Sequence, residues 1–207
     1  MIPELKDKKM NVESMAEKAL EDEKILSELL DNLKIKDETV RYNSSKVLNL
    51  ISQKNPGVLY PHWDYFVRLL LSDHTYWKLS VIPVIANLTG IDTQNKFKDV
   101  FDKYFGLLND KSMITAVWIA ANSGRIAKAK PDLQTRITDT LLRIDETHHD
   151  PERIDLIKGG AIESFDEYFE ETQDKKKILE FVRKQKECKS PKTRKIALKF
   201  LEKWTYE

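Results

Sequence analysis

The chain reads KDETVRYNSSKVLNLI over residues 36–51, and this stretch shows how the molecule is built. A short polar break opens a run in which apolar residues return at helical spacing, as an amphipathic helix requires. The break is centred on Asp37, whose carboxylate can accept hydrogen bonds from the free N–H groups of a first helical turn. A second apolar helical run, residues 25–33, precedes the break. The stretch therefore predicts two helices joined by a short turn.

The same break recurs at a nearly constant interval along the 207 residues. Its centres lie at spacings of 36, 37, 40 and 40 residues, and they are Asp37, Asp73, Asp110, Asp150 and Ser190. Such a period is typical of stacked helical pairs rather than of one globular core. We therefore predict an all-α protein, an α-α superhelix that forms a right-handed solenoid of about five helical pairs. The expected single domain covers 1–207, with a capping helix in 1–22 and pairs at 23–55, 56–90, 91–129, 130–172 and 173–207.

The pattern resembles the HEAT repeat, a pair of antiparallel helices with an Asp at the turn and a Val-Arg pair soon after it. The run Asp37-Glu38-Thr39-Val40-Arg41 matches this most closely, and Ser190-Pro191-Lys192-Thr193-Arg194 keeps the arginine. The middle pairs depart from the pattern, with Trp77, Ile114 and Ile154 in place of the arginine. The resemblance covers residues 23–204. It implies a HEAT-like superhelical scaffold whose second helices line a concave face that binds proteins and sometimes nucleic acid.

Two helix interiors carry unusual residues. Pro83 falls inside the second helix of the second pair, where its missing N–H predicts a kink or a local break. Gly159 and Gly160 fall in the middle of a helix, where close packing or a bend is the usual explanation.

Composition excludes several classes of protein. Lys and Arg number 35 against 34 Asp and Glu, so the formal net charge is +1 and no general excess of positive charge favours nucleic acid. A single cysteine, Cys188, allows no internal disulfide and no cysteine-rich zinc site. No apolar run is long enough to cross a bilayer, so we expect a cytoplasmic protein that does not enter a membrane.

A stripe on the second helices is the first candidate binding site. Four, eight and twelve residues after each break, the middle pairs carry mostly apolar side chains. The candidate residues for a protein or peptide partner on the concave face are Arg41, Trp77, Val81, Ile85, Ile114, Trp118 and Asn122. Core packing between the pairs is the alternative for the same residues, and helices that are apolar almost all round fit either interpretation.

Charge is uneven near the C-terminus. Residues 145–174 carry a local balance of −9, and residues 175–203 carry +9. The two blocks can simply solvate the protein and pair with each other. The alternative is a phosphate-binding basic patch made of Lys184, Lys186, Lys189, Lys192, Arg194 and Lys195.

No catalytic motif stands out, so we expect a non-enzymatic scaffold, monomeric, with no cofactor and no metal. His148-His149-Asp150 is expected to be a polar turn rather than a metal site, because no further histidine or cysteine cluster completes it. The enzyme alternative is a DNA alkylation-repair glycosylase, since those proteins also use HEAT-like pairs. Trp118 and Asn122 would stand in its site, although Asn lacks the negative charge of the Asp in that family. A protein similar to the bilin lyases is a third possibility.

Overall fold

The protein is described by a computed structural model that covers residues 2–205, apart from the side chain of Glu152. Every regular element in this range is a helix and none is a strand, so the all-α prediction is confirmed. The chain divides into two compact units, Met1–Gln94 and Asn95–Glu207.

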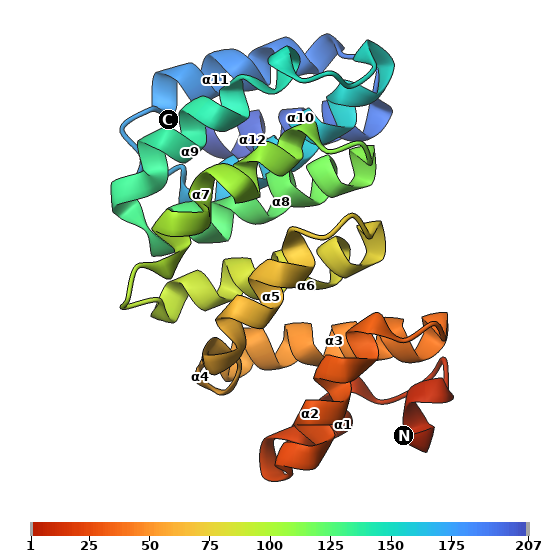
Figure 1. The fold of residues 1–207 in the computed structure, drawn as a ribbon. Coiled ribbons are helices and arrows are strands. Elements are labelled where there is room, and N and C mark those ends of the chain that lie inside the picture. The colour runs from red at the N-terminus through yellow and green to blue at the C-terminus, as the bar shows by residue number, and fades with distance from the viewer. Residues whose placement is uncertain (1, 206–207) are drawn as a thin grey trace. The chain divides into compact units, whose positions relative to one another are not determined.

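The first unit contains α1 to α6 (Figure 1). Their bounds are α1 Val12–Glu21, α2 Glu23–Asp31, α3 Glu38–Lys54, α4 Pro56–Leu59, α5 Trp63–Leu70 and α6 Thr75–Leu88. The helix α1 is the predicted N-terminal helix, and it packs on α2 and α3. Ahead of it, Leu5 is fully buried, and Asn43 on α3 donates hydrogen bonds to the carbonyls of Leu5 and Asp7, both at 2.9 Å. The N-terminal segment is therefore tied to α3.

The second unit contains α7 to α12. Their bounds are α7 Lys96–Gly106, α8 Met113–Ala129, α9 Gln134–Leu142, α10 Pro151–Tyr168, α11 Lys175–Lys184 and α12 Pro191–Thr205. Within this unit α7, α9 and α11 form one layer, and α8, α10 and α12 form the other (Figure 1). The side chains between the layers make the core, and the largest fully buried ones are Tyr104, Tyr168, Phe97 and Phe165.

Contacts in both units follow the predicted period. Tyr65 donates to the carbonyl of Leu30, 35 residues earlier, and Asn87 donates to Ser52, also 35 residues earlier. In the second unit Thr193 donates to the carbonyl of Asp155, 38 residues earlier, and Trp204 donates to Asp166, also 38 residues earlier. Contacts near the start and near the end of α10 and α12 both join residues 38 positions apart. These two helices therefore run parallel and in register. Successive second helices therefore stack side by side within a unit.

The start of the second helix differs from prediction in two pairs. Asp37 does cap α3, since it accepts from the N–H groups of Thr39 and Val40 at 3.0 and 3.1 Å. Asp73 and Asp110 do not cap, and the prediction is wrong there. The residue before α6 is His74 and the residue before α8 is Ser112, and neither side chain caps its helix.

Asp110 forms its hydrogen bond in the turn before α8. Its carboxylate accepts from the N–H of Ser112 at 2.8 Å, which fixes the turn rather than the first helical turn. The residues that directly precede the second helices are therefore Asp37, His74, Ser112, Asp150 and Ser190. The corrected spacings are 37, 38, 38 and 40 residues, closer to one constant repeat than the predicted breaks.

The two unusual helix interiors have different outcomes. The helix α6 continues through Pro83 without the predicted local break, and Ile82 and Val84 beside it are fully buried. Gly160 lies against α8, where an added Cβ would be 3.0 Å from the carbonyl oxygen of Val117. Gly159 lies against α12, where an added Cβ would be 2.8 Å from the hydroxyl oxygen of Thr193. Close packing, one of the two predicted explanations, therefore accounts for both glycines.

Candidate functional site

The corrected helix starts define which residues share a face of the second helices. Positions 2, 6 and 13 after the residue that precedes a helix point the same way, since α-helices repeat every 3.6 residues. On α8 these positions hold Ile114, Trp118 and Arg125. Ile114 and Trp118 are 42% and 39% exposed, one helical turn apart. Two large apolar side chains thus stand side by side in solvent.

The same positions on α10 and α12 continue this surface, because the three helices of the unit are parallel and in register. On α10 they hold Leu156, which is half-buried, and Glu163, which is exposed. On α12 they hold Lys192, Ile196 and Lys203, and Lys199 lies on the same side. We call this surface the second-helix face, made of Ile114, Trp118, Arg125, Leu156, Glu163, Lys192, Ile196, Lys199 and Lys203.

Behind the second-helix face, α8 and α10 approach each other closely at a glycine. An added Cβ on Gly124 of α8 would lie 2.5 Å from the carbonyl oxygen of Ser164 on α10. The Ser164 hydroxyl accepts from the Gly124 N–H at 2.9 Å and donates to the carbonyl of Ala120 at 2.5 Å. These two backbone groups stand four residues apart and would bond each other in a regular helix. The Ser164 hydroxyl of α10 therefore bridges a backbone N–H and a backbone carbonyl of α8.

The predicted binding stripe divides into exposed and buried residues. Ile114 and Trp118 belong to the second-helix face. Val81 and Ile85 are fully buried, so they belong to the core, the alternative interpretation of the stripe. Every residue from Ser80 to Ala86 is buried where α6 packs against α3 and α5, so this burial does not depend on the register of the helix.

Trp77 and Asn122 are held by neighbours. The Trp77 indole is half-buried and stacks on His74, with ring centroids 4.7 Å apart and planes 16° apart. Asn122 is buried, donates to the carbonyl of Trp118 at 2.8 Å and accepts from Arg125 at 3.1 Å. Asn122 therefore helps to position the residues of the face from beneath.

The arginine that the HEAT resemblance singles out has a local partner in both places where it occurs. Arg41 is buried and donates to the carbonyl of Ile35 at 3.0 Å, six residues earlier. Arg194 donates to the carbonyl of Cys188, also six residues earlier, at 2.7 Å and to that of Lys189 at 3.0 Å. Each guanidinium thus fastens the turn between the two helices of its pair. Neither arginine is an open binding group.

The other members of the predicted basic patch are exposed but not all on one face. Lys192 lies on the second-helix face. Lys184 is the last residue of α11, Lys186 lies in the short 3-10 helix Gln185–Glu187 that follows it, and Lys189 lies in the turn before α12. Lys195 follows Lys192 on α12. The cysteine in this turn, Cys188, is half-buried, and burial raises the pKa of its thiol above the usual range, which favours the unreactive protonated form.

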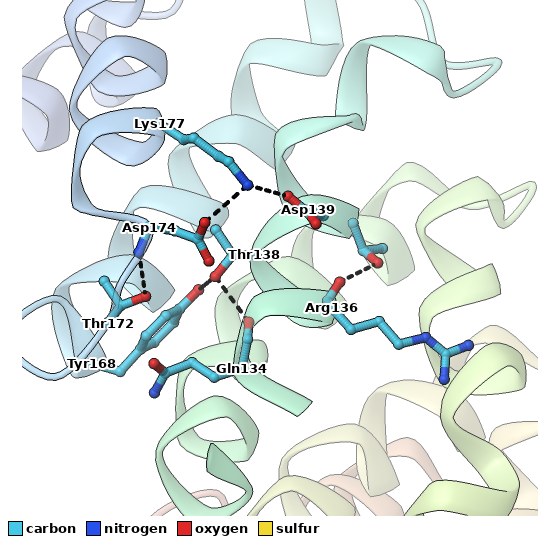
Figure 2. A network of polar contacts seen from close by, with 9 residues as sticks. Gln134, Arg136, Thr138, Asp139, Tyr168, Thr172, Asp174 and Lys177 are labelled. Atoms are coloured by element: carbon cyan, nitrogen blue, oxygen red, sulfur yellow. Dashed lines mark hydrogen bonds and ion pairs between the residues drawn. The ribbon is translucent and has the colours of Figure 1, made fainter. Parts of the chain in front are cut away.

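A network between α9, α10 and α11 fixes the first helices of the unit (Figure 2). Lys177 bridges Asp174 at 2.9 Å and Asp139 at 3.1 Å, and these hydrogen bonds raise the pKa of the Lys177 ammonium. The buried hydroxyls of Thr138 and Tyr168 lie 2.8 Å apart, and burial raises the pKa of Tyr168. Every charge in the network has an opposite neighbour. Its role is to hold α11 against α9.

A cleft between α7 and α9 was not anticipated from the sequence. It has a volume of about 780 Å³, with Phe101 and Phe105 in its floor. Arg136 at its edge pairs with Asp102 at 2.5 Å and lies 3.9 Å from the centroid of the Phe101 ring. The four-residue spacing of the two phenylalanines was visible, but it signals core as readily as cleft. Acidic residues outnumber basic ones in the lining of the cleft by four to two, Asp102, Asp132, Asp139 and Glu146 against Arg136 and Arg143.

Residues 2–205 bring together no group of three histidine, cysteine, aspartate or glutamate side chains that could hold a metal ion. His148 instead donates its N–H to Asn109 at 2.9 Å, and His149 meets the carbonyl of Leu108 at 2.9 Å, so both belong to a polar turn. No helix in this range has the length and apolar character needed to cross a bilayer.

Comparison with known proteins found no matching family model, no matching curated protein and no matching solved structure.

Proposed function

We propose that the chain is a non-enzymatic, HEAT-like solenoid that binds a protein or peptide segment through the second-helix face. The exposure of Ile114 and Trp118 carries this proposal. Adjacent exposed apolar side chains cost free energy in water, and partially exposed aromatic residues are the strongest anchors of protein interfaces. Two apolar side chains one turn apart give the apolar stripe of a partner helix a surface to pack against.

The packing behind the face supports the same proposal. Binding costs less when the receiving surface is already ordered, because fewer side chains must be immobilised. The close approach of α8 and α10 through Gly124 and Gly160 leaves little room for either helix to shift. The period of 37 to 40 residues and the turn-fastening role of Arg41 and Arg194 support the HEAT-like part of the proposal.

The test uses the full chain as bait for a display library of random segments of about 16 residues, long enough for four helical turns. Enriched segments are synthesised, and their Kd is measured for wild type, Trp118→Ala and Leu198→Ala. Leu198 is the matched control, since it is an apolar residue of α12, 50% exposed, that lies off the face. We expect Trp118→Ala to raise Kd at least about tenfold and Leu198→Ala to leave it nearly unchanged.

Two outcomes contradict the proposal. One is an equal loss in both variants, which would indicate general hydrophobic adsorption. The other is the absence of any enriched segment whose binding depends on Trp118.

A further inference from the structure

The exposed side of α12 carries a row of four lysines. Their spacings are three, four and four residues, so they lie along one side of the helix, and they are Lys192, Lys195, Lys199 and Lys203. Lys203 pairs with Asp166 of α10 at 2.9 Å. The side chains of the other three form no ion pair or hydrogen bond with any residue in the described range 2–205.

This arrangement is costly for an isolated helix. Like charges three or four residues apart destabilise a helix by a few tenths of a kcal/mol for each pair. Lys203 lies in the last turn and recovers part of this cost through the helix dipole, but Lys192 lies in the first turn, where a positive charge is unfavourable. A negatively charged partner would relieve the repulsion along the whole row.

Three lysines of the row, Lys192, Lys199 and Lys203, belong to the second-helix face with the apolar pair of α8, and Lys195 lies beside them on α12. One helix, α10, separates them, and packed helices stand about 8–10 Å apart, so the distance across the face is about 16–20 Å. A helix of about 12 residues covers this distance at 1.5 Å per residue. Residues of α10 and α12 also line a pocket of about 280 Å³ on this side of the unit. Its lining residues are Ile162, Glu163, Asp166, Ile196, Lys199, Phe200 and Lys203.

We propose that the segment bound by this face is acidic: its apolar side chains cover Ile114 and Trp118, and its carboxylates meet Lys192, Lys195 and Lys199. The inference rests on the proposed function and adds the chemistry of the partner. Charge complementarity of this kind sets specificity and the rate of association.

A peptide fits the face better than a nucleic acid does. Glu163 lies on α10 between the apolar pair and the lysine row, and Glu167 lies one turn further along the same helix, exposed. A phosphate backbone that crossed the face would meet both carboxylates. A peptide can place uncharged or basic side chains opposite them and keep its acids for the lysine row.

The test continues the selection with the random library. The net charge of the enriched segments is compared with that of the starting library, and each segment is also synthesised with Gln in place of its Asp and Glu residues. Binding of both forms is measured for wild type, for Lys192→Gln/Lys199→Gln, and for the control Lys184→Gln/Lys186→Gln, whose lysines are exposed but lie off the face. A single-stranded oligonucleotide serves as the phosphate probe.

We expect acidic segments to be enriched, and we expect replacement of their acids to raise Kd about tenfold at low salt. The Lys192→Gln/Lys199→Gln variant should lose this preference, and Lys184→Gln/Lys186→Gln should keep it. The inference is overturned if the enriched segments show no charge bias, if both lysine variants behave alike, or if the oligonucleotide binds more tightly than the segments.

The two proposals fail in different ways. If Trp118→Ala weakens binding of the acidic and the neutral segments alike while the lysine variants change nothing, the docking face stands and the acidic partner is wrong. If Trp118→Ala changes nothing, the docking face itself is wrong.

Discussion

The two units bring their second helices together by different means. In the first unit α3 and α6 meet through side-chain amides and hydroxyls: Asn87 of α6 donates to Ser52 of α3 at 2.8 Å and to Asn49 at 3.3 Å. In the second unit α8 and α10 meet through glycine, and the Ser164 hydroxyl bonds directly to the backbone of α8. Polar side chains hold helices at ordinary spacing, whereas glycine lets the backbones touch. The second helices of both units expose aromatic side chains, Tyr42 and Tyr76 in the first and Trp118 in the second. The unit with the closer contact is the one that adds a lysine row on α12.

The largest effect is expected from Gly124→Ala. The new Cβ would lie 2.5 Å from the carbonyl oxygen and 2.9 Å from the Cα of Ser164, and backbone atoms cannot turn away as a side-chain end can. Overpacking of this kind costs about 3 kcal/mol of unfolding free energy, measured by urea denaturation. Gly106→Ala is the control, since nothing lies within 4 Å of the added atom. Equal stability of the two variants would mean that α8 and α10 are not in close contact.

A smaller loss is expected from Ser164→Ala. The change removes both hydrogen bonds between the hydroxyl and the backbone of α8 while leaving room for the methyl group. The expected cost is about 1–3 kcal/mol, because a buried site loses a donor and an acceptor together. Amide hydrogen exchange should show faster opening at Gly124 and its neighbours in α8. Unchanged exchange there would contradict the bridging role of Ser164.

Asn87→Ala tests the polar contact of the first unit. The amide is half-buried and its hydrogen bonds to Ser52 and Asn49 are lost, for which we expect a cost of about 1 kcal/mol. Hydrogen exchange should rise in α3 and α6. A loss as large as that of Gly124→Ala would remove the distinction between the two kinds of contact.

The smallest effect is a pH dependence of the first unit. Burial, and then the 2.6 Å hydrogen bond to Asp92, raise the pKa of Tyr60 to about 12. The pKa of an unfolded tyrosine is about 10, so between about pH 10 and 12 the unfolded chain loses a proton that the folded chain keeps. The unfolding free energy should therefore fall as pH rises from about 10 to 12. Tyr65, whose pKa burial also raises to about 12, contributes in the same sense.

Tyr60→Phe isolates the contribution of this residue. The variant should lose stability less steeply than wild type over the same pH range, as measured by urea denaturation at several pH values. A slope identical to that of wild type would show that the Tyr60 hydroxyl does not hold its proton more tightly in the folded state.

Sequence periodicity was sufficient to predict the helices and their repeat, because apolar residues at helical spacing form the side of each helix that is buried. It was not sufficient for the register of the face. An aspartate near a helix start was taken as the cap, but the Asp110 carboxylate accepts instead from the N–H of Ser112. Nor did the periodicity show that α6 is buried on all sides from Ser80 to Ala86, which places Val81 and Ile85 of the predicted stripe in the core.

The roles of the arginines could not be predicted from residue type. A guanidinium can bind a phosphate, a carboxylate or a carbonyl, and only the position of the turn carbonyls decides among them. The carbonyls of Ile35 and Cys188 lie within reach of Arg41 and Arg194, and each accepts a hydrogen bond from the guanidinium.

The central claim is that the docking surface follows the corrected register rather than the predicted stripe. It is tested by measuring the Kd of one enriched segment for Trp118→Ala and for Trp77→Ala. The concentration of folded protein is used for each variant, so that a loss of stability is not read as a loss of affinity. The two residues are of one type and lay on the same predicted stripe, yet only Trp118 lies on the second-helix face. We predict an increase of at least about tenfold for Trp118→Ala and less than about twofold for Trp77→Ala. An equal or larger increase for Trp77→Ala would contradict the account.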